Sequence, residues 1–166
     1  ENKSMENRII TLQQEYDHLR RKYIKAYNDM LDAKHNSSVN LLKPEIIDII
    51  TNTFKYWEGK RLHNYAFTIM SNHIHWVFEV LEKNENGQLI YLEDILQSVK
   101  RYSANRINKV ENRQGNLWQK ESFDTTIRSY EHMAKAINYT LNNPVNAGLI
   151  SNWKQWPGSY WSDDCL

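Results

Sequence analysis

The spacing of the apolar residues changes at about residue 60, and this change limits the possible folds more than any other feature. Residues 5–34 place apolar side chains every three or four positions without glycine or proline, which predicts a long amphipathic helix. A second helix is predicted to start at Pro44. Residues 61–81 are then aromatic and β-branched without a helical period, and the turn signal at 71–72 predicts a β-hairpin.

Helical patterns return after the hairpin. Residues 89–110 predict a third helix, 117–127 an extended segment and 129–142 a fourth helix, which Pro144 is expected to end. The tryptophan-rich tail is expected to pack irregularly on the body of the protein. Helices that flank an antiparallel hairpin indicate an α+β fold. The length suits a single domain over residues 1–166, with 5–34 as its long helical N-terminal segment.

Composition excludes several classes of protein. A single cysteine rules out an intrachain disulfide scaffold and a multi-cysteine zinc cluster. The chain has no apolar stretch long enough to span a membrane, so we expect a soluble, cytoplasmic protein. The net charge of +1 is a sum in which a mostly acidic stretch at 79–94 offsets a basic stretch at 97–128, so it does not exclude a nucleic-acid partner.

The hairpin carries two histidines with one residue between them, His73-Ile74-His75. Residues i and i+2 of a strand point to the same face, so both imidazoles could reach one divalent ion while Ile74 faces the core. Two packed or exposed histidines would give the same pattern. A metal site therefore needs further ligands.

The fourth helix offers both a ligand and a nucleophile. Tyr139 and Asn143 are four residues apart and share one face of that helix. The amide oxygen of Asn143 could bind a hard cation beside two imidazoles. The phenol of Tyr139 could attack a phosphorus centre if a metal polarises the phosphate. From spacing alone, an ordinary residue of an amphipathic helix is the simpler interpretation of Tyr139.

Four segments together resemble one known family. Residues 66–75 look like the strand and the His-hydrophobe-His motif of the HUH single-tyrosine (IS200-like) transposases. Residues 98–108, 116–128 (LWQ, FD and IR) and 139–149 (YTLNNPVNAGL) are similar, in the same order and spacing, to signatures of the REP-associated tyrosine transposases. The resemblance covers residues 61–161.

The resemblance implies cleavage and rejoining of single-stranded DNA at an element that folds into a hairpin. His73 and His75 would hold Mg²⁺ or Mn²⁺, with Asn143 as a further ligand, and Tyr139 would form a 5′-phosphotyrosine link. Ser122 stands where the family often has a tyrosine, but that tyrosine is not the nucleophile assigned here. The resemblance leaves open whether the chain acts alone or as a homodimer with sites formed in trans.

The basic stretch then acquires a function, because lysine and arginine neutralise phosphates and aromatic rings stack on unpaired bases. A solvated surface charge remains the alternative for each lysine and arginine, and core packing the alternative for the tryptophan. The residues predicted to bind DNA are Lys100, Arg101, Tyr102, Arg106, Lys109, Arg113, Trp118, Lys120 and Arg128.

The family fold is a ferredoxin-like antiparallel sheet with flanking helices, in which the first strand precedes the first helix. No strand pattern precedes residue 5, so we expect that strand upstream of Glu1, unless residues 8–12 form it. Two other functions remain open. One is a domesticated, non-catalytic protein that binds hairpin DNA, and the other is a metal-dependent phosphodiesterase that uses water instead of Tyr139.

Overall fold

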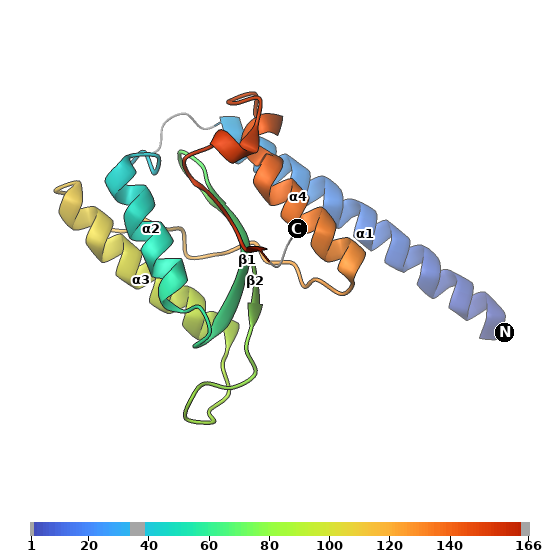
Figure 1. The fold of residues 1–166 in the computed structure, drawn as a ribbon. Helices are drawn as coiled ribbons and strands as arrows, with labels where there is room; N and C mark the ends of the chain where they lie inside the picture. The colour runs from blue at the N-terminus through green and yellow to red at the C-terminus, as the bar shows by residue number, and fades with distance from the viewer. Residues whose placement is uncertain (1, 34–38, 164–166) are drawn as a thin grey trace. The chain divides into compact units, whose positions relative to one another are not determined.

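The computed structural model describes residues 2–33 and 39–163 of the chain. The chain divides into two compact units, Glu1–Asn36 and Ser37–Leu166, and each is described by itself. The described part of the first unit is one helix, α1 (Asn2–Ala33), drawn in blue in Figure 1. The helix predicted over 5–34 is therefore confirmed as far as residue 33, and the single domain over 1–166 stays a prediction.

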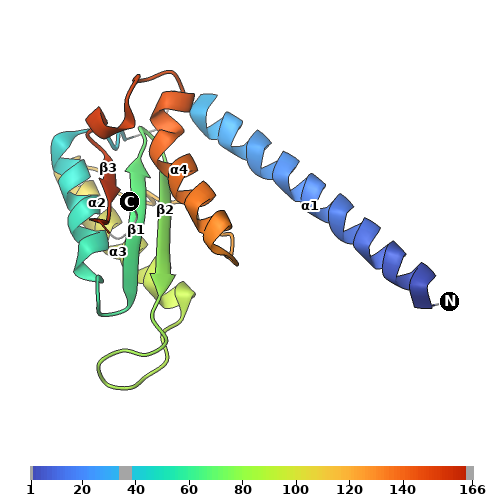
Figure 2. The ribbon, with the colours of Figure 1, turned by 45° about the vertical axis from the view of Figure 1, so that its right-hand side comes forward.

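The second unit combines helices with a three-stranded antiparallel sheet. Its elements are α2 (Pro44–Tyr56), β1 (Leu62–Ile69), β2 (Ile74–Val80), α3 (Leu92–Val110), α4 (Tyr130–Asn146), the short 3-10 helix η1 (Trp153–Gln155) and β3 (Ser159–Trp161). The strand order is β2-β1-β3, and both pairings are antiparallel. Figures 1 and 2 show α2 and α3 on one side of this sheet and α4 on the other. The predicted α+β class and the predicted hairpin are confirmed.

The face of the sheet that meets α2 and α3 forms the hydrophobic core, and we call it the core face. Phe54 of α2 lies edge-on to Phe67 of β1, with ring centroids 5.1 Å apart, and stacks on Trp76 of β2 at 3.9 Å. Side chains of β2 and β3 pack against this core in a partly buried state. The buried apolar side chains of its helices and strands come from α2, β1 and α3: Ile46, Ile50, Phe54, Leu62, Phe67, Ile69, Ile95, Val99 and Ile107.

A bulge in β1 decides which residues face the core. The register between β1 and β2 shifts between Asn64 and Ala66, so Tyr65 is the extra residue. Because strand side chains alternate, the shift turns Phe67 to the core face. The same shift turns Thr68 to the opposite face, which lies under α4 and which we call the α4 face.

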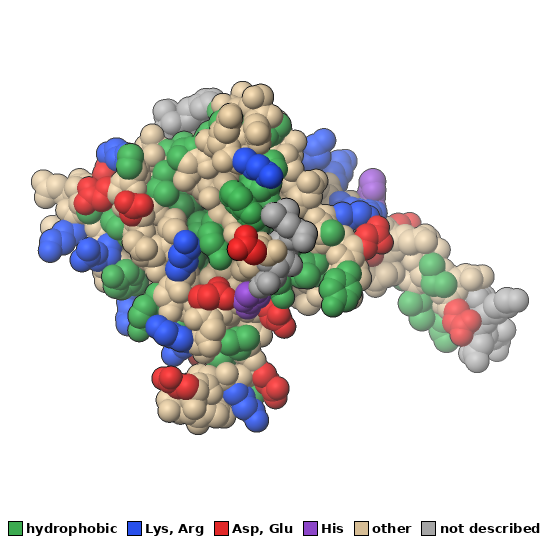
Figure 3. All heavy atoms as spheres, viewed as in Figure 1, with side chains coloured by type: hydrophobic (Ala, Val, Ile, Leu, Met, Phe, Trp, Pro, Cys, Tyr) green, Lys and Arg blue, Asp and Glu red, His purple; other side chains and the backbone are tan. Residues whose placement is uncertain are grey.

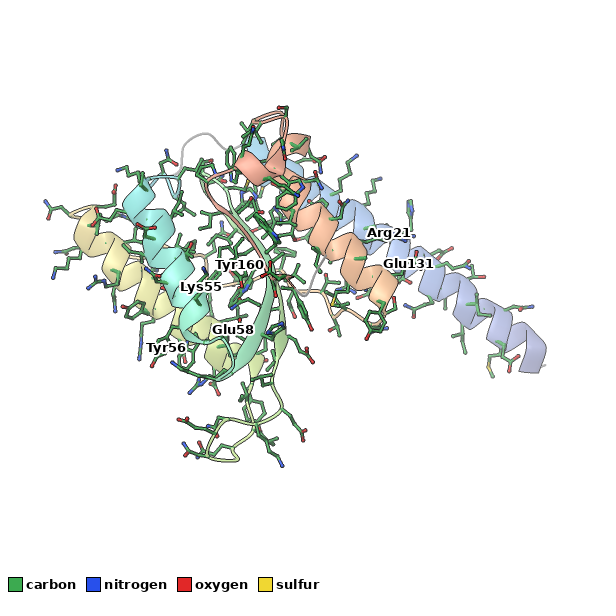
Figure 4. The ribbon with its side chains drawn as sticks, in the orientation of Figure 1. Arg21, Lys55, Tyr56, Glu58, Glu131 and Tyr160 are labelled. Atoms are coloured by element: carbon green, nitrogen blue, oxygen red, sulfur yellow. The ribbon has the colours of Figure 1, made fainter. Side chains whose placement is uncertain are left out.

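The tail was predicted to pack irregularly on the body of the protein. Instead, it supplies the third strand of the sheet, β3. Ile69 donates a backbone hydrogen bond to the carbonyl of Gly158 at 2.9 Å, and a side chain at 158 would lie 2.6 Å from the Ile69 carbonyl oxygen. Tyr160 of β3 stacks on Phe67 at 4.8 Å, and the ammonium of Lys55 lies 4.9 Å from the centre of the Tyr160 ring (Figure 4). Aromatic packing and this close backbone approach therefore hold β3 on the sheet.

The prediction that Pro144 ends the fourth helix is wrong. Helix α4 begins after Ser129, whose side chain accepts a hydrogen bond from the backbone of His132, and runs through Pro144 to Asn146. A proline near the end of a helix removes only the one hydrogen bond that its missing N–H would have donated. The next turn forms, because Ala147 donates to the carbonyl of Asn143 at 2.9 Å. Gly148, with a φ of +70°, ends the helix.

Two further boundaries complete the fold. Helix α3 begins at Leu92 rather than at residue 89, because Leu89 pairs with Lys83 in an isolated β-bridge. Within residues 2–33 and 39–163, no strand precedes Leu62, and residues 8–12 lie in α1. None of the described helices is long and apolar enough to cross a membrane.

Candidate active site

The two histidines of the hairpin lie side by side on the α4 face. His75 is opposite Thr68 in the β1–β2 register, and its Nε2 is 3.1 Å from Nε2 of His73. Two ligands at right angles around a cation such as Mg²⁺, each about 2.1 Å from it, would be about 3 Å apart. The imidazole pair therefore has a spacing that fits neighbouring ligands of one ion.

The surroundings of these histidines favour their neutral, ligating form. Nδ1 of His73 lies 2.7 Å from the amide oxygen of Asn72, which can only accept, so Nδ1 carries the proton and Nε2 is left with its lone pair. Burial lowers the pKa of His73 to about 4. Burial, with His73 beside it, lowers the pKa of His75 to about 3. Both rings are thus neutral near pH 7, as metal binding requires.

Tyr139 of α4 reaches these histidines within one chain. Its ring meets that of His75 edge-on, with centroids 5.5 Å apart, and 42% of the residue is exposed. The structure therefore brings together three of the four residues that the sequence assigned to metal binding and nucleophilic attack. We call His73, His75 and Tyr139 the His–Tyr cluster.

Asn143 lies one turn further along α4 and is 3% exposed. Among the described residues, its side-chain oxygen has no hydrogen-bond partner. An unsatisfied buried acceptor costs about 1–3 kcal/mol, so such atoms are rare without a ligand. No group of three or more His, Cys, Asp or Glu in the described ranges could hold a metal. Two imidazoles of the hairpin and an amide oxygen of α4 are donors of the types that suit a hard divalent cation.

Two hydroxyl side chains that the sequence analysis did not single out lie on the same face. Thr68 is opposite His75 on one side and opposite Ser159 on the other, so the three residues form a row across β2, β1 and β3. Within the described part of the chain, the hydroxyls of Thr68 and Ser159 are buried without a hydrogen-bond partner. The sequence alone could have identified Thr68 as the neighbour of His75 only if the position of the bulge in β1 and the register between β1 and β2 had been known.

Three of the residues predicted to bind DNA take part in local structure. The ammonium of Lys100 donates to the carbonyls of Gln119 and Lys120 at 2.9 and 3.1 Å and so ties the segment after α3 to that helix. Arg113 donates to the carbonyl of Asn116 at 3.3 Å. Trp118 packs against the core, and its indole N–H donates to Ser103 at 2.8 Å.

The remaining predicted DNA-binding residues are exposed, but the structure separates them. Arg101, Tyr102, Arg106 and Lys109 are on α3, which packs on the core face, away from the His–Tyr cluster. Figure 3 shows that, over α2 and α3, lysine and arginine side chains are interspersed with acidic side chains. Lys120 and Arg128 lie on the segment that leads from α3 to α4. Arg128 directly precedes Ser129, the N-cap of the helix that carries Tyr139.

Comparisons with known proteins bear on the family resemblance and on the fold. No protein-family model matches the chain. A curated Haemophilus influenzae protein, described as a "Putative REP-associated tyrosine transposase", is 27% identical over 103 residues, which are 60% of this chain and 58% of that protein. A solved structure described as the REP-associated tyrosine transposase bound to a REP hairpin superposes with a TM-score of 0.58 at 16% identity, over 80% of this chain and 82% of its own.

The chain is similar to REP-associated tyrosine transposases. The resemblance found in the sequence is thereby confirmed, and the solved structure supports the fold. The chain spans about 58% of the length of the curated relative that it matches.

Proposed function

We propose that the chain is a metal-dependent endonuclease and strand transferase for single-stranded DNA, acting on hairpin DNA through a 5′-phosphotyrosine intermediate at Tyr139. The observation that carries this proposal is the contact of Tyr139 with His75, which lies beside His73. One turn further along the same helix, Asn143 keeps a buried oxygen without a partner among the described residues. A nucleophile thus adjoins two imidazoles, and its helix offers a third neutral donor of the kind that binds Mg²⁺ or Mn²⁺.

Each residue of the cluster has a defined task in this reaction. The phenol of Tyr139, whose ordinary pKa is about 10, loses its proton to solvent as its oxygen bonds to the scissile phosphorus. The bond from phosphorus to the 3′-oxygen breaks, and that oxygen leaves as a 3′-hydroxyl. A divalent ion held by His73, His75 and Asn143 would draw charge from the phosphate and orient it. The phosphotyrosine keeps the bond energy, so a 3′-hydroxyl can reseal the strand without ATP.

The proposed substrate is a DNA hairpin with a single-stranded flank. The solved structure to which the chain is similar is described as bound to a REP hairpin, and that partner is proposed here by analogy. Arg128 is the exposed basic residue at the entry to α4, so we assign it to the phosphates next to the cluster. Lys120 is also exposed, but its carbonyl group is held by Lys100 of α3, so it lies with the basic residues of that helix. The basic residues and Tyr102 of α3 would contact DNA only where it extends around to the other side of the sheet.

Incubation of the purified chain with such a hairpin and Mn²⁺, followed by a denaturing gel, tests the proposal. We expect a protein–DNA adduct that Tyr139→Phe abolishes while hairpin binding persists. Tyr130→Phe is the matched control, because Tyr130 lies on the same helix and is 89% exposed. That variant should form the adduct as the unaltered chain does.

The other outcomes separate the alternatives. Binding of the hairpin without an adduct under any divalent metal would support a non-catalytic hairpin-binding protein. Cleaved DNA without a protein-linked species would support a phosphodiesterase that uses water. An adduct that survives Tyr139→Phe would overturn the assignment of the nucleophile.

A further inference from the structure

Helix α1 exposes an apolar stripe along its length. Ile9, Leu12, Tyr16 and Leu19 are 62%, 57%, 61% and 64% exposed. Single exposed apolar residues are common on protein surfaces, but large exposed apolar patches mark interaction sites. Most of the stability of a helix in a protein comes from packing of its apolar face, so a stripe of this length calls for a partner.

The spacing of the stripe is that of a coiled coil. Apolar residues alternate at intervals of three and four positions, which is a heptad repeat with positions a and d filled. The a positions are Ile9, Tyr16, Tyr23 and Met30, and the d positions are Met5, Leu12, Leu19 and Ala26. A stripe that packed on a globular body would be wider, with a third apolar position in each heptad on the same side. Apart from Tyr27, the e and g positions that flank the stripe are polar or charged, and this narrow stripe favours another helix of the same kind.

The charges beside the stripe favour a second copy of α1 in the same direction. In a parallel pair in register, the residue at position g of one helix approaches the residue five positions later on its partner. Glu15 then meets Arg20 of the other copy, which is an attractive pair. The pairs that start at Arg8 and Lys22 place them opposite uncharged Gln13 and Tyr27, so these three pairs contain no like charges.

We infer that α1 is a dimerisation element, which pairs with α1 of a second copy of this chain in a parallel, in-register two-stranded coiled coil. The helix is drawn as one uninterrupted rod in Figure 2, and its 32 residues give about 48 Å of contact length. This inference is independent of the proposed activity. A dimer of this kind would carry two His–Tyr clusters in one complex.

The mass of the full chain in solution tests dimerisation directly. Light scattering after size exclusion should give twice the chain mass. Leu12→Glu with Leu19→Glu places charges in the seam and should raise the dimer dissociation constant by roughly 100-fold or more. The matched control is Ile10→Glu with His18→Glu, because both residues are exposed and lie at positions b and c, away from the seam. This control adds the same two acidic residues and should leave the dimer intact.

A cysteine crosslink tests the orientation. In a Cys165→Ser background, Ala26→Cys should form a disulfide between two copies on mild oxidation, because a parallel pair in register places residue 26 opposite itself. In an antiparallel pair, residue 26 would lie opposite a different heptad, so dimers without the crosslink would overturn the parallel arrangement. A chain that is monomeric up to roughly 100 µM, a concentration that fills dimers of micromolar affinity, would overturn the inference as a whole.

Discussion

The two faces of the three-stranded sheet are both covered, but the buried polar side chains that the strands place on them differ in how well their hydrogen bonds are satisfied. On the core face, Asn64 donates to the carbonyl of Phe54 at 3.2 Å and accepts from the indole of Trp76 at 2.8 Å. On the α4 face, the described neighbours leave side-chain oxygens of Thr68 and Asn143 without a partner.

Under the proposed function, the difference separates the face that stabilises the sheet from the face that would bind a ligand. Buried polar groups without partners cost free energy, so a fold that keeps several of them on one face has another use for them. The same hairpin thus supplies the hydrophobic core with one set of alternating residues and the candidate metal site with the other. The following variants test this contrast, from the largest expected effect to the smallest.

Phe67→Ala removes the central ring of the core face. Because Phe67 is 1% exposed and contacts Phe54 and Tyr160, we expect the free energy of unfolding to fall by about 3–5 kcal/mol. Denaturant titration measures this change. Adduct formation per folded molecule should remain near that of the unaltered chain, and a loss of stability below about 1 kcal/mol would contradict the role of this face.

His75→Gln should have the opposite effects, with adduct formation lost and the stability of the fold retained. The loss of one metal ligand should slow adduct formation roughly 100-fold or more, because a bound metal supplies several kcal/mol of charge stabilisation. The free energy of unfolding without metal should change little. His63→Gln is a control in the same hairpin, since His63 lies against Glu58 and away from Tyr139. Equal loss of activity in both variants would show that the effect is general to the hairpin.

Thr68→Val and Thr53→Val compare the same substitution on the α4 face of the sheet and in α2, which covers the core face. The hydroxyl of Thr53 donates to the carbonyl of Ile49, so its removal should lower the free energy of unfolding by about 1 kcal/mol. The hydroxyl of Thr68 is buried without a partner among the described residues, so its removal should raise stability by about 1 kcal/mol in metal-free protein. Urea titrations measure both, and destabilisation of similar size in the two variants would remove the contrast between the faces.

Acid should lower the free energy of unfolding of the metal-free protein, because two histidines are buried in their neutral form on the α4 face. The pKa values of His73 and His75 are lowered to about 4 and about 3, below the ordinary 6.5. The unfolded chain therefore takes up protons that the folded chain does not, and stability falls as pH drops from about 6.5 towards about 4. Denaturation in the presence of a chelator at pH values between these limits measures the slope. His75→Gln should reduce it, and an unchanged slope would show that the histidine is not the cause.

The sequence predicted much of the site because its elements follow simple periods. The placement of His73 and His75 on one face needs only the alternation of a strand, and the pairing of Tyr139 with Asn143 needs only one turn of a helix. Both inferences depend only on residues that are close together in the sequence. The approach of α4 to β2, which brings Tyr139 against His75, depends on the whole fold and came into view only through the family resemblance.

The features that the sequence did not reveal depend on contacts between distant segments. The strand β3 is three residues long, and it forms because Tyr160 stacks on Phe67 and Gly158 allows the close approach to Ile69. The row that includes Thr68 depends on a bulge whose position follows from pairing with β2. A proline was expected to end α4, but the cost of one missing hydrogen bond near the helix terminus was too small to do so.

The charge pattern also needed the structure for its interpretation. The basic stretch at 97–128 is continuous in sequence, yet Lys100 binds carbonyl groups of its own chain, and the exposed basic residues of α3 lie on the side opposite the His–Tyr cluster. Local charge indicated a DNA-binding surface. It could not show which of these residues lie near the cluster.

The proposed function makes the α4 face an active site whose nucleophile is Tyr139. Its most direct test is mass spectrometry of the protein–DNA adduct after digestion with protease and nuclease, with the hairpin and Mn²⁺ as substrates. We expect a nucleotide linked through its 5′-phosphate to the peptide that contains Tyr139. A nucleotide on another residue, or hairpin DNA that is cleaved and never linked to the protein, would contradict it.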